Sequence, residues 1–493
     1  MEELLNDQEL VRREKINKLK ELGVDPFGEK YERTHNSLTA REAVEGKTNE
    51  ELEANHIYVN VAGRVMSVRR MGKASFMNIQ DKFGKIQAYI GIDVVGEHDY
   101  EVLKLTDIGD FVGLYGRLMF TRTGELTIRV EKYTFLTKSL KVLPEKFHGL
   151  TDIEERYRKR YIDLIVNDDA KRVALLRPRI IRSIQNYFDN LGFVEVETGV
   201  LQPILGGASA RPFVTHHNTL DKDFYLRIAT ELPLKRLIVG GLEKVYEIGR
   251  LFRNEGMDTK HNPEFTTVEL YEAFGDLQSM RNLMEGVIRN TVKEVLHSDV
   301  ITFGELTLDI SKPFRWVSMA ELVKDKTGID FTADITFEEA KKLAAQNGIK
   351  VEAHMTSTGF ILNEFFEKFC EGDLIQPTFV TGHPIEISPL TKKSKDPRFT
   401  ERFELYMAGF EVCNAYSELN DPLDQIERFE AQIKAKELGD DEANEMDYDF
   451  IEALEYGMPP TGGVGMGIDR LIMLLANEQS IREVILFPCM KDR

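Results

Sequence analysis

One segment, Arg253–Phe265, constrains the fold more than any other part of the sequence. The stretches on either side of it, Lys244–Gly249 and Phe265–Tyr271, alternate apolar and polar residues, which predicts two antiparallel strands joined by a polar loop. A guanidinium at the start of such a loop can neutralise a phosphate through paired hydrogen bonds, and an aromatic ring at its end can carry a base. The segment therefore predicts a nucleotide-binding hairpin, with an ordinary solvated hairpin as the alternative.

The length of the chain and its cysteines limit the class of protein. A chain of 493 residues exceeds one ordinary hydrophobic core, so at least two domains are expected. No apolar run is long enough to span a bilayer, and the acidic N-terminus is unlike a signal peptide. The three cysteines, Cys370, Cys413 and Cys489, lie far apart and fit neither a disulfide framework nor a zinc site. We expect a cytoplasmic protein with no membrane partner.

Charge bears on possible nucleic-acid partners. A net charge of −19 argues against nonspecific binding of polyanions. Basic residues still cluster at 12–20 and at 156–160, which leaves a specific RNA partner open. Solvated helix faces are the alternative interpretation of both clusters.

The pattern of the N-terminal third predicts two parts. Residues 1–55 form an N-terminal helical extension, with an amphipathic helix that ends at Gly23 and has a basic outer face. Residues 56–145 contain five short strands separated by turn signals, which favours a small closed barrel of the oligonucleotide-binding (OB) type over a generic β-domain. The expected strands are 58–65, 75–80, 85–92, 111–120 and 126–135.

The rest of the chain mixes strands with helices. Residues 146–165 are predicted to be a linker, and a long helix over 171–191 follows. Strands and helices then follow without strict alternation, which favours an antiparallel α+β core within 166–493 over a doubly wound sheet. Residues from about 316 to 373 read as a mostly helical insertion.

Two carboxylates could form a metal site. Glu404 and Glu411 would hold Mg²⁺ against phosphate oxygens if they converge. Their odd spacing puts them on opposite faces of a single strand unless a bulge intervenes, and Gly409 could mark such a bulge. Surface glutamates are the alternative.

Further acidic residues could line a pocket. Glu231, Glu269 with Tyr271, and Asn414 with Glu418 occur close to strand signals. If they share one cavity, its negative charge would favour a substrate with an ammonium group. Solvent-facing strand glutamates are the alternative.

A glycine-rich run near the C-terminus, Gly463–Gly467, alternates glycine with apolar residues. Glycines on one strand face let a flat ligand approach closely. Arg470 follows at the expected strand-to-helix junction, where its guanidinium could stack or reach a phosphate. The spacing matches neither a phosphate loop nor a dinucleotide fingerprint.

Together these segments resemble class II aminoacyl-tRNA synthetases, and within that class the lysyl-tRNA synthetases, over essentially the full length. Phe252–Tyr271 is similar to the second signature motif of the class, and Gly465–Leu471 to the third. Gly206–Phe213, and Asn414 with Glu418, resemble the lysine-specific pattern. The resemblance implies an α+β protein, with an N-terminal five-stranded OB-fold β-barrel that binds the anticodon, followed by a class II catalytic domain built on an antiparallel sheet flanked by helices.

The resemblance also implies a role for each site residue. Arg253 and Arg470 would be the catalytic residues, with Arg253 at the α-phosphate and Arg470 opposite Phe265 across the adenine. Mg²⁺ would be held by Glu404 and Glu411. The full ATP-binding set would be Arg253, Glu255, His261, Asn262, Phe265, Glu404 and Arg470. The lysine-binding set would be Gly207, Glu231, Glu269, Tyr271, Asn414 and Glu418. The anticodon-binding set would be Arg69, Phe76, Gln87 and Glu131.

The activity that the resemblance implies has two steps. L-Lysine would react with ATP to give lysyl-adenylate and pyrophosphate, and lysine would then pass to the 3′-terminal ribose of tRNA(Lys). A homodimer is also implied. One departure concerns the dimer motif, because Gly199 follows Glu197-Thr198 where the family usually has proline.

Three other interpretations compete with this one. A non-catalytic relative that keeps the fold would be expected to lack Arg253, Glu411 or Arg470, and all three are present. A relative that modifies proteins would lack the barrel. An enzyme for aspartate or asparagine would need cations where this pocket is acidic.

Overall fold

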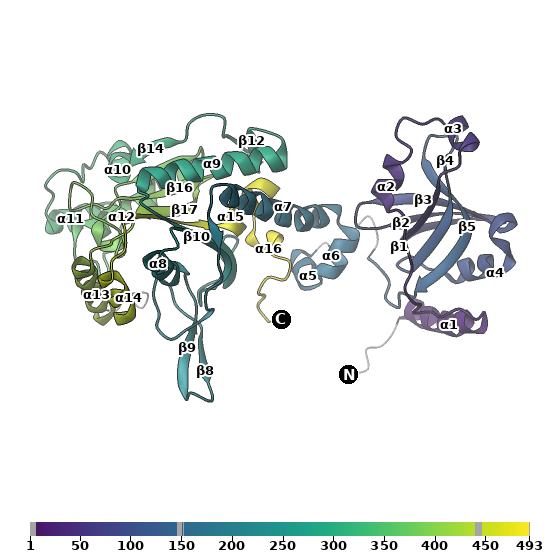
Figure 1. Ribbon diagram of the computed structural model, residues 1–493, viewed down its shortest axis with the longest axis horizontal. Coiled ribbons are helices and arrows are strands. Elements are labelled where there is room, and N and C mark those ends of the chain that lie inside the picture. Colours follow the sequence, from purple (N-terminus) through teal and green to yellow (C-terminus); the bar gives the residue numbers. More distant parts are fainter. Residues whose placement is uncertain (1–5, 145–149, 151, 439–445, 493) are drawn as a thin grey trace. The chain divides into compact units, whose positions relative to one another are not determined.

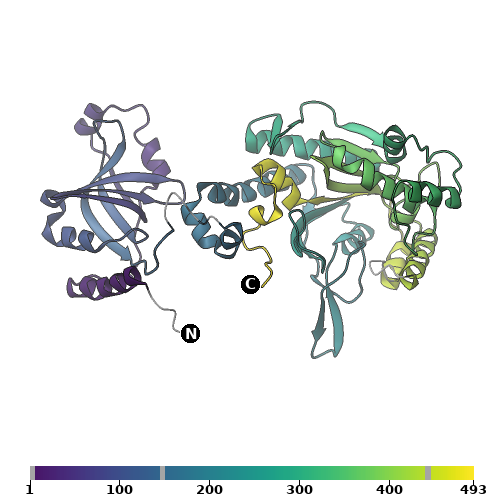
Figure 2. The same ribbon diagram turned by 180° about the vertical axis from the view of Figure 1, so that it is seen from behind.

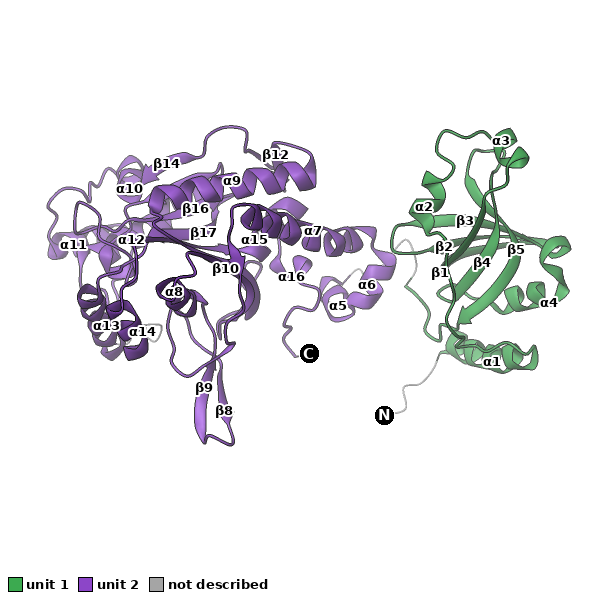
Figure 3. Ribbon diagram, viewed as in Figure 1, with its two compact units in different colours: residues 1–150 green, residues 151–493 purple. Residues whose placement is uncertain are grey.

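The structure is a computed structural model that describes residues 6–144, 150, 152–438 and 446–492. The contacts within the chain divide it into two compact units, residues 1–150 and 151–493 (Figure 3). Each unit has a hydrophobic core of its own. Among the described residues, no helix combines the length and the apolar character that crossing a bilayer requires.

The first unit is built on a closed five-stranded barrel with the strand order β1-β2-β3-β5-β4 (Figure 1). This confirms the predicted OB-type barrel. The strands are β1 (Tyr58–Met71), β2 (Ala74–Gln80), β3 (Lys85–Gly91), β4 (Phe111–Phe120) and β5 (Leu126–Thr137). Alternate residues of β2 and β3 are buried, as expected for strands with one face toward a core.

Four helices accompany the barrel. They are α1 (Asp7–Glu21), α2 (Ser37–Glu42), α3 (Asn49–Ala54) and α4 (Ile92–Leu105). The sequence patterns predicted α1 but not α4, which lies between β3 and β4 and bends at Gly96, where φ is 85°. That break interrupts the helical period and hides the helix from a pattern search.

The basic cluster at the N-terminus is partly structural, which corrects the prediction that it forms an outer face. Arg12 is 7% exposed. Its guanidinium donates to the carbonyl oxygens of Ile108, Ser139 and Lys141 at 2.9–3.0 Å and so fastens α1 to the barrel. Lys15 pairs with Asp107 at 2.6 Å.

The second unit is built on an eight-stranded sheet with the order β14-β15-β16-β17-β18-β11-β10-β6. Neighbouring strands are antiparallel except the outer pairs β14/β15 and β10/β6, so the predicted antiparallel α+β class is confirmed. The strands are β6 (Val194–Glu195), β10 (Lys244–Phe252), β11 (Glu264–Ala273), β14 (Arg315–Ser318), β15 (Thr378–Thr381), β16 (Arg402–Met407), β17 (Phe410–Ser417) and β18 (Thr461–Gly467).

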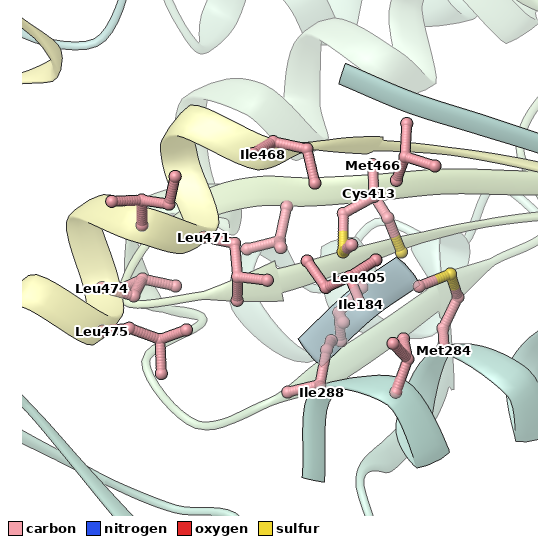
Figure 4. Packing of buried hydrophobic residues seen from close by; sticks show 14 of the residues in the cluster. Ile184, Met284, Ile288, Leu405, Cys413, Met466, Ile468, Leu471, Leu474 and Leu475 are labelled. Atoms are coloured by element: carbon pink, nitrogen blue, oxygen red, sulfur yellow. The ribbon is translucent and has the colours of Figure 1, made fainter. Parts of the chain in front are cut away.

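One face of this sheet is covered by α7 (Asp168–Asn190), α9 (Leu277–Leu296) and α15 (Ile468–Ala476). Their buried side chains interdigitate with those of the strands, as Ile184, Met284 and Leu471 do around Leu405 and Cys413 (Figure 4). Successive side chains of a strand point to opposite faces. The alternate residues of the central strands therefore face away from these helices, and they line the cleft described below.

Other helices of the second unit form satellite cores. The helices α8 (Glu231–Val239), α13 (Pro422–Glu437) and α14 (Tyr448–Glu455) share one hydrophobic cluster. The stretch predicted to be a mostly helical insertion contains α10 (Met319–Thr327), α11 (Phe337–Gln346) and α12 (Thr358–Phe369), which share another. The hairpin of β8 (Val214–His217) and β9 (Lys222–Leu226) projects from the unit in both views (Figures 1 and 2). The remaining elements are α5 (Ile153–Arg158), α6 (Arg160–Val166), β7 (Leu201–Gln202), β12 (Val300–Phe303), β13 (Leu306–Asp309), α16 (Ile481–Val484) and two short 3₁₀ turns, Glu371–Asp373 and Ile385–Ile387.

Part of the predicted linker, 146–165, is helical. Residues 145–149 and 151 lie outside the described residues, but α5 and α6 follow directly. Arg160, the first residue of α6, is 1% exposed and donates to the carbonyl oxygens of Arg482 and Leu486, and Arg156 of α5 pairs with Glu483. The second basic cluster therefore holds the C-terminal segment in place rather than presenting all its cations to solvent. The exact domain boundaries stay a prediction.

Candidate active site

The uncovered face of the large sheet forms a cleft of about 820 Å³. Strands β11, β16, β17 and β18 supply its floor, and the loop between β10 and β11 supplies one wall. Thirteen of the predicted site residues line it: Gly207, Glu231, Arg253, Glu255, His261, Asn262, Phe265, Glu269, Tyr271, Glu404, Glu411, Asn414 and Arg470. Glu418 is not itself a lining residue, but its Oε1 lies against Gly463 of the floor. The structure thus brings the predicted ATP and lysine sets into one cavity, while the role of each residue stays a prediction.

The glycines of β18 lie between residues of the two neighbouring strands. Gly463 is opposite Tyr271 of β11 and Tyr416 of β17, and Gly465 is opposite Glu269 and Asn414. A Cβ atom added at Gly463 would overlap the Tyr271 ring and the Oε1 atom of Glu418. Glycine is therefore required at this position by close approach.

Glu404 and Glu411 converge, but not in the predicted way. They lie on different strands, β16 and β17, joined by a tight turn at Ala408 and Gly409 with φ of 55° and 78°. Gly409 therefore belongs to the hairpin turn and not to a bulge, which corrects the prediction. The bulge lies further on: Leu405 pairs with Cys413 and Tyr406 pairs with Glu411, so Val412 is the extra residue. This register shift turns Glu411 and Asn414 to the same face.

One end of the cleft is cationic. The Arg253 guanidinium lies 5.3 Å from the centroid of the Phe265 ring. Burial lowers the pKa of Arg253, and the carboxylates of Glu255, Glu411 and Glu269 oppose that fall. An arginine remains charged under these conditions. The main-chain N–H of Arg253 donates to Pro263 O at 2.8 Å and closes the base of the loop.

Arg470 connects this end to the carboxylates. It is the third residue of α15, and it donates to the main-chain oxygen of Glu411 at 2.8 Å and to its carboxylate at 3.3 Å. Its other terminal nitrogen donates to Nε2 of His261 at 3.3 Å, so that Nδ1–H of His261 donates to Asp258 at 2.9 Å. The chain holds both side chains in place without a ligand.

The start of α15 is fixed by a buried ion pair. Asp469, 2% exposed, accepts from the main-chain N–H of Thr266 at 2.7 Å and from Arg177 of α7 at 2.5 Å. Asp469 therefore ties β11 to α15, and this places Arg470 beside the loop that carries Arg253. Asp469 and Arg177 were not singled out from the sequence.

Buried polar atoms without a partner mark where a ligand would bind. Among the described residues, Nε of Arg253, Oδ1 of Asn262 and Oε1 of Glu418 are buried and have no hydrogen-bond partner. Leaving such groups unsatisfied costs about 1–3 kcal/mol each. All three atoms belong to the cleft or its floor, so a bound polar molecule would satisfy them.

The donor set at Glu404 and Glu411 fits a hard divalent cation. Arg402 donates to Glu404 Oε1 and Tyr406 OH donates to Oε2, both at 2.6 Å. Glu367 and Glu371 lie nearby: burial raises the pKa of each, and the charge of Glu404 raises both further. Carboxylate oxygens in a field of surplus negative charge are the ligands Mg²⁺ prefers. Within the described part of the chain, no cluster of three or more acidic, histidine or cysteine side chains has the geometry of a complete metal site. Phosphate oxygens would have to complete the coordination.

The other end of the cleft is acidic and dry. Glu231 opens α8, and Glu418 follows β17; they are 4% and 1% exposed. Between them lies Lys235, whose Nζ contacts Oε1 of Glu231 at 2.5 Å and Oε2 of Glu418. The second oxygen of Glu231 accepts from Tyr416 OH at 2.6 Å. The position that remains open toward the cleft is Oε1 of Glu418.

Glu269 is the third buried carboxylate, on β11. Burial and the charge of Glu231 raise its pKa to about 7, while the main-chain N–H of Thr230, at 3.2 Å, and Arg253 oppose that rise. Tyr271 OH lies 3.5 Å from its second oxygen. Glu269 stands between the cationic and the acidic ends.

The barrel presents a separate candidate surface. Arg69 of β1 is opposite Phe76 of β2, which is opposite Tyr89 of β3, and the Phe76 and Tyr89 ring centroids are 5.2 Å apart. Gln87 accepts from Thr127 Oγ1 at 2.9 Å. Alternate residues here point away from the barrel core, which is the placement that base stacking needs.

Glu131 owes its position on the barrel to an irregularity. The β4–β5 register shifts between Tyr115 and Gly116, which leaves Glu131 as a bulge residue without a partner opposite. Bulges re-aim side chains at functional surfaces. Of this region, the sequence missed only the aromatic partner, Tyr89.

Besides Asp469 and Arg177, sequence reasoning missed three further side chains in or beside the cleft. They are Arg402, which joins Glu404 to Asn414 Oδ1 at 2.9 Å, together with Tyr416 and Lys235. A signal existed for Lys235, because it follows Glu231 by one helical turn, the spacing of a side-chain pair on a helix. No local signal distinguishes Arg402 from a surface arginine.

A sheet face of this architecture, with paired arginines, carboxylates and a glycine floor, defines a nucleotide-dependent class II synthetase. The model of the tRNA synthetases class II (D, K and N) matches residues 152–491, and that of the OB-fold nucleic acid binding domain matches residues 59–136. The chain belongs to this class II tRNA synthetase family.

Individual relatives are similar over their whole length. The lysine–tRNA ligase of Lactococcus lactis subsp. cremoris (strain MG1363) is 57% identical over 490 residues, which is 99% of each chain. The lysine–tRNA ligase of Streptococcus suis (strain 05ZYH33) is 56% identical over 490 residues, 99% of each chain. The lysine–tRNA ligase of Bacillus subtilis (strain 168) is 53% identical over 492 residues, 100% of this chain and 98% of that one.

Proposed function

We propose that this chain is a lysine–tRNA ligase. It activates L-lysine with ATP to lysyl-adenylate and pyrophosphate, and then transfers lysine to the 3′-terminal ribose of tRNA(Lys). The relatives that bear this name support the proposal, as does the charge of the cleft. The observation that carries it is the buried, unpartnered Oε1 of Glu418 at the floor of a cleft whose other end is cationic.

The acidic end suits the side chain of lysine. A primary ammonium offers three donors and no acceptor. Oε1 of Glu418 can accept one of them, with Tyr271 and Glu231 close by. A neutral amino acid would leave this buried carboxylate unpaired, which is a strong basis for rejection. Aspartate would be repelled, because the cation here, Lys235, is already held by two carboxylates.

The middle of the cleft suits the α-amino and α-carboxyl groups of lysine. Glu269 and Asn414 flank Gly465 and supply acceptors for the amino group. The Gly207 backbone has a φ of 90°, and a Cβ there would come within 3.1 Å of the Ala229 side chain, so a larger residue would crowd this end. The carboxylate of the substrate would then point toward the cationic end.

The cationic end suits ATP. Arg253 would neutralise the α-phosphate, with its unpartnered Nε available for a second contact. The adenine would lie between Phe265 and Arg470, and Glu255 would accept from its amino group. Asp258 holds Nδ1 of His261, and the His261 ring would contact the outer phosphates. Oδ1 of Asn262 is the second unpartnered atom at this end of the cleft.

The chemistry needs no side-chain nucleophile. The carboxylate of lysine attacks the α-phosphorus in line, the bond to the bridging oxygen breaks, and pyrophosphate leaves. Positioning of the two substrates and neutralisation of the charge that develops on the phosphoryl oxygens supply the rate. The main-chain contact of Arg253 with Pro263 and the contact of Arg470 with Glu411 support these roles.

Mg²⁺ is part of the proposal. Glu404 and Glu411 would hold it after Glu404 exchanges its contacts with Arg402 and Tyr406. When bound, the ion would neutralise charge on the phosphates and orient them.

The second step requires tRNA. A ribose hydroxyl at its 3′ end attacks the carbonyl carbon of lysyl-adenylate, and AMP leaves. On the barrel, Phe76 would stack an anticodon base, while Arg69, Gln87 and Glu131 would read base edges. Single-stranded bases are recognised by such a combination of a ring and polar side chains.

A homodimer in the cytoplasm completes the proposal. β6 is an edge strand of the large sheet, and four apolar residues around it are exposed: Leu191, Val194, Val200 and Leu201. A second copy would cover them. A Cβ added at Gly199 would meet only the main-chain oxygen of Leu201, at 3.5 Å, which is an ordinary contact. Light scattering in solution should give twice the mass of one chain, and a monomer at micromolar concentration would contradict this part.

Amino-acid-dependent exchange of pyrophosphate into ATP tests the activity. The assay is run with each of the twenty amino acids, without tRNA, in the presence of Mg²⁺. Exchange with lysine is expected to exceed every other amino acid. The absence of exchange at saturating lysine would contradict the proposal, and faster exchange with aspartate or asparagine would assign the chain to a different branch of the family.

A further inference from the structure

Lys235 lies in the wall of the acidic end and is the most deeply buried cation of the cleft region. Its side chain is 0% exposed, as is that of Glu418. Three aromatic rings surround its ammonium, with centroids at 5.6 Å (Tyr416), 5.9 Å (Phe450) and 6.0 Å (Tyr271). The ammonium therefore has no access to water, and its charge is balanced by Glu231 and Glu418 alone.

The charges of Lys235, Glu231 and Glu418, called the triad below, do not balance. Two carboxylates and one ammonium leave one negative charge, and one carboxylate oxygen, Oε1 of Glu418, has no hydrogen-bond partner within the described residues. A dry site with a surplus of one charge is costly until a counter-ion arrives. The site is therefore complete only with a single additional cation.

The contacts of Lys235 also determine which carboxylate oxygen of Glu418 faces the cleft. Lys235 takes the Oε2 side of Glu418 and the Oε1 side of Glu231, and Tyr416 OH takes the remaining oxygen of Glu231. Glu418 is left with its free oxygen against Gly463, on the cleft side. The N-terminus of α8, where Glu231 stands, favours the same ionised state of that residue.

We propose that Lys235 is a specificity-determining positioning residue, a built-in counter-ion that holds Glu231 and Glu418 in place and limits the pocket to one net negative charge. The inference rests on the proposed function, because it takes the single cation to be the side-chain ammonium of the amino-acid substrate. Lys235 itself does not touch the reacting atoms. It acts through the two carboxylates.

The neighbouring charges are consistent with this role. Burial would lower the pKa of Lys235, but the two carboxylates outweigh it and raise that pKa. Burial raises the pKa of Glu418, and Lys235 is the group that opposes the rise, against Glu231 and Glu269. Other groups facing the triad are the hydroxyls of Tyr271 and Tyr416, both with raised pKa values because they are buried beside these carboxylates, and more distantly Arg402.

Removing Lys235 should therefore leave two carboxylates that cannot both stay ionised. Lys235→Met is expected to raise the lysine KM in ATP–pyrophosphate exchange by about 30-fold at pH 7, because one carboxylate takes up a proton. The lysine KM should recover as the pH rises, and the ATP KM should stay within about twofold of wild type. A loss of fold would instead lower kcat and disturb both KM values without a pH trend.

Arg236→Met is the matched control. Arg236 is the next residue of α8, and it also bridges two carboxylates, Asp447 and Asp449, at 2.8 Å, but outside the cleft. The same loss of charge on the same helix should leave the lysine KM within about twofold of wild type, because a partly exposed ion pair contributes little.

A double variant makes the sharpest test, and it decides the matter even if Lys235→Met alone does not fold. Glu418→Gln leaves Lys235 and Glu231 as a neutral pair. Combining Glu418→Gln with Lys235→Met restores one negative charge, so this double variant should have a lysine KM about tenfold lower than Glu418→Gln alone. A double variant no better than Glu418→Gln would overturn the inference.

Different experimental results would contradict the proposed function and the proposed role of Lys235. If wild-type protein shows no lysine-dependent exchange, the proposed function is wrong. If wild type exchanges with lysine, while Lys235→Met shows no pH-dependent rise of the lysine KM and the double variant shows no rescue, only the role of Lys235 is wrong.

Discussion

The two ends of the cleft differ both in charge and in how deeply their charged side chains are buried. At the acidic end, Glu231, Glu418 and Lys235 are at most 4% exposed and their contacts are complete except for one oxygen. At the cationic end, His261 and Glu255 are exposed. Buried charges without a partner are costly, so the closed end can discriminate strongly between ligands. The open end can exchange a large, hydrated polyanion. We therefore expect selectivity and turnover to depend on different ends of the cleft.

The largest effect is expected at the cationic end. Arg253→Ala should lower kcat/KM for exchange by about 1,000-fold, because a cation aimed at the developing phosphoryl charge is lost from a water-poor site. Arg250→Ala is the control: Arg250 lies on β10, three residues before Arg253, but forms a surface pair with Glu264, and it should change activity by less than about twofold. A loss below tenfold in Arg253→Ala would remove this residue from the phosphate site.

A substitution at the acidic end should change the KM for lysine and not kcat. Glu418→Gln should raise the lysine KM about 100-fold and leave the ATP KM within about twofold, because the ammonium then meets no net charge. Glu272→Gln, in the surface pair with Lys244, serves as control. Equal changes in both KM values would mean that Glu418 supports the whole cleft, and the contrast between the two ends would collapse.

The barrel offers a third region that should affect neither end. Phe76→Ala should lower kcat/KM for tRNA aminoacylation about 30-fold, the effect of one lost base stack, and leave exchange unchanged. Phe27→Ala, at a 52% exposed phenylalanine of the same unit, should leave both activities unchanged. If exchange falls together with aminoacylation in Phe76→Ala, the anticodon assignment fails.

The smallest effect concerns Glu269, between the ends. Its pKa is raised to about 7, so below pH 7 the carboxylate is protonated and cannot pair with the amino group of lysine. The lysine KM should rise by about tenfold for each unit of pH below 7, in steady-state exchange between pH 5.5 and 8. Glu269→Gln should have a high lysine KM without this slope. A steep slope that persists in this variant would assign the titration to another group.

The same carboxylate makes a prediction about stability. Because its folded pKa lies above that of the unfolded chain, the folded state binds the additional proton between about pH 4.5 and 7. The contribution of Glu269 to stability is therefore fully present below that window and is lost as the pH rises through it. In denaturant titrations, Glu269→Gln should be stabilised relative to wild type more at pH 8 than at pH 5.

Much of the fold was predictable because the signals are local. The barrel strands and the long helix α7 follow from alternation and helical periodicity. Pattern alone did not reveal α4, whose period is broken at Gly96, nor the hairpin that separates Glu404 from Glu411. A turn at Ala408 and Gly409 requires positive φ at both positions, and alanine seldom adopts it, so the turn has no clear signature.

The residues of the candidate site could be predicted from the sequence, but their arrangement in space could not. Individual residues such as Arg253 follow from motif resemblance. Which of them meet depends on sheet register, and register is set by pairings between strands far apart in sequence. Lys235 shows the consequence: its helical partner Glu231 is local, but Glu418 reaches it only through the fold.

Where β18 forms the floor of the cleft, the floor consists of main chain. The glycines of this strand have only a hydrogen atom where residues of the other strands have a side chain. A point mutation cannot give this surface a new side chain without blocking it, since any substituent at Gly463 would overlap Tyr271 and Glu418. Changes of substrate in this architecture must therefore come from the flanking elements β11, β17 and α8, while the β18 part of the floor remains a common template. Inhibitors that lie flat against β18 would accordingly meet resistance only through the residues that border it.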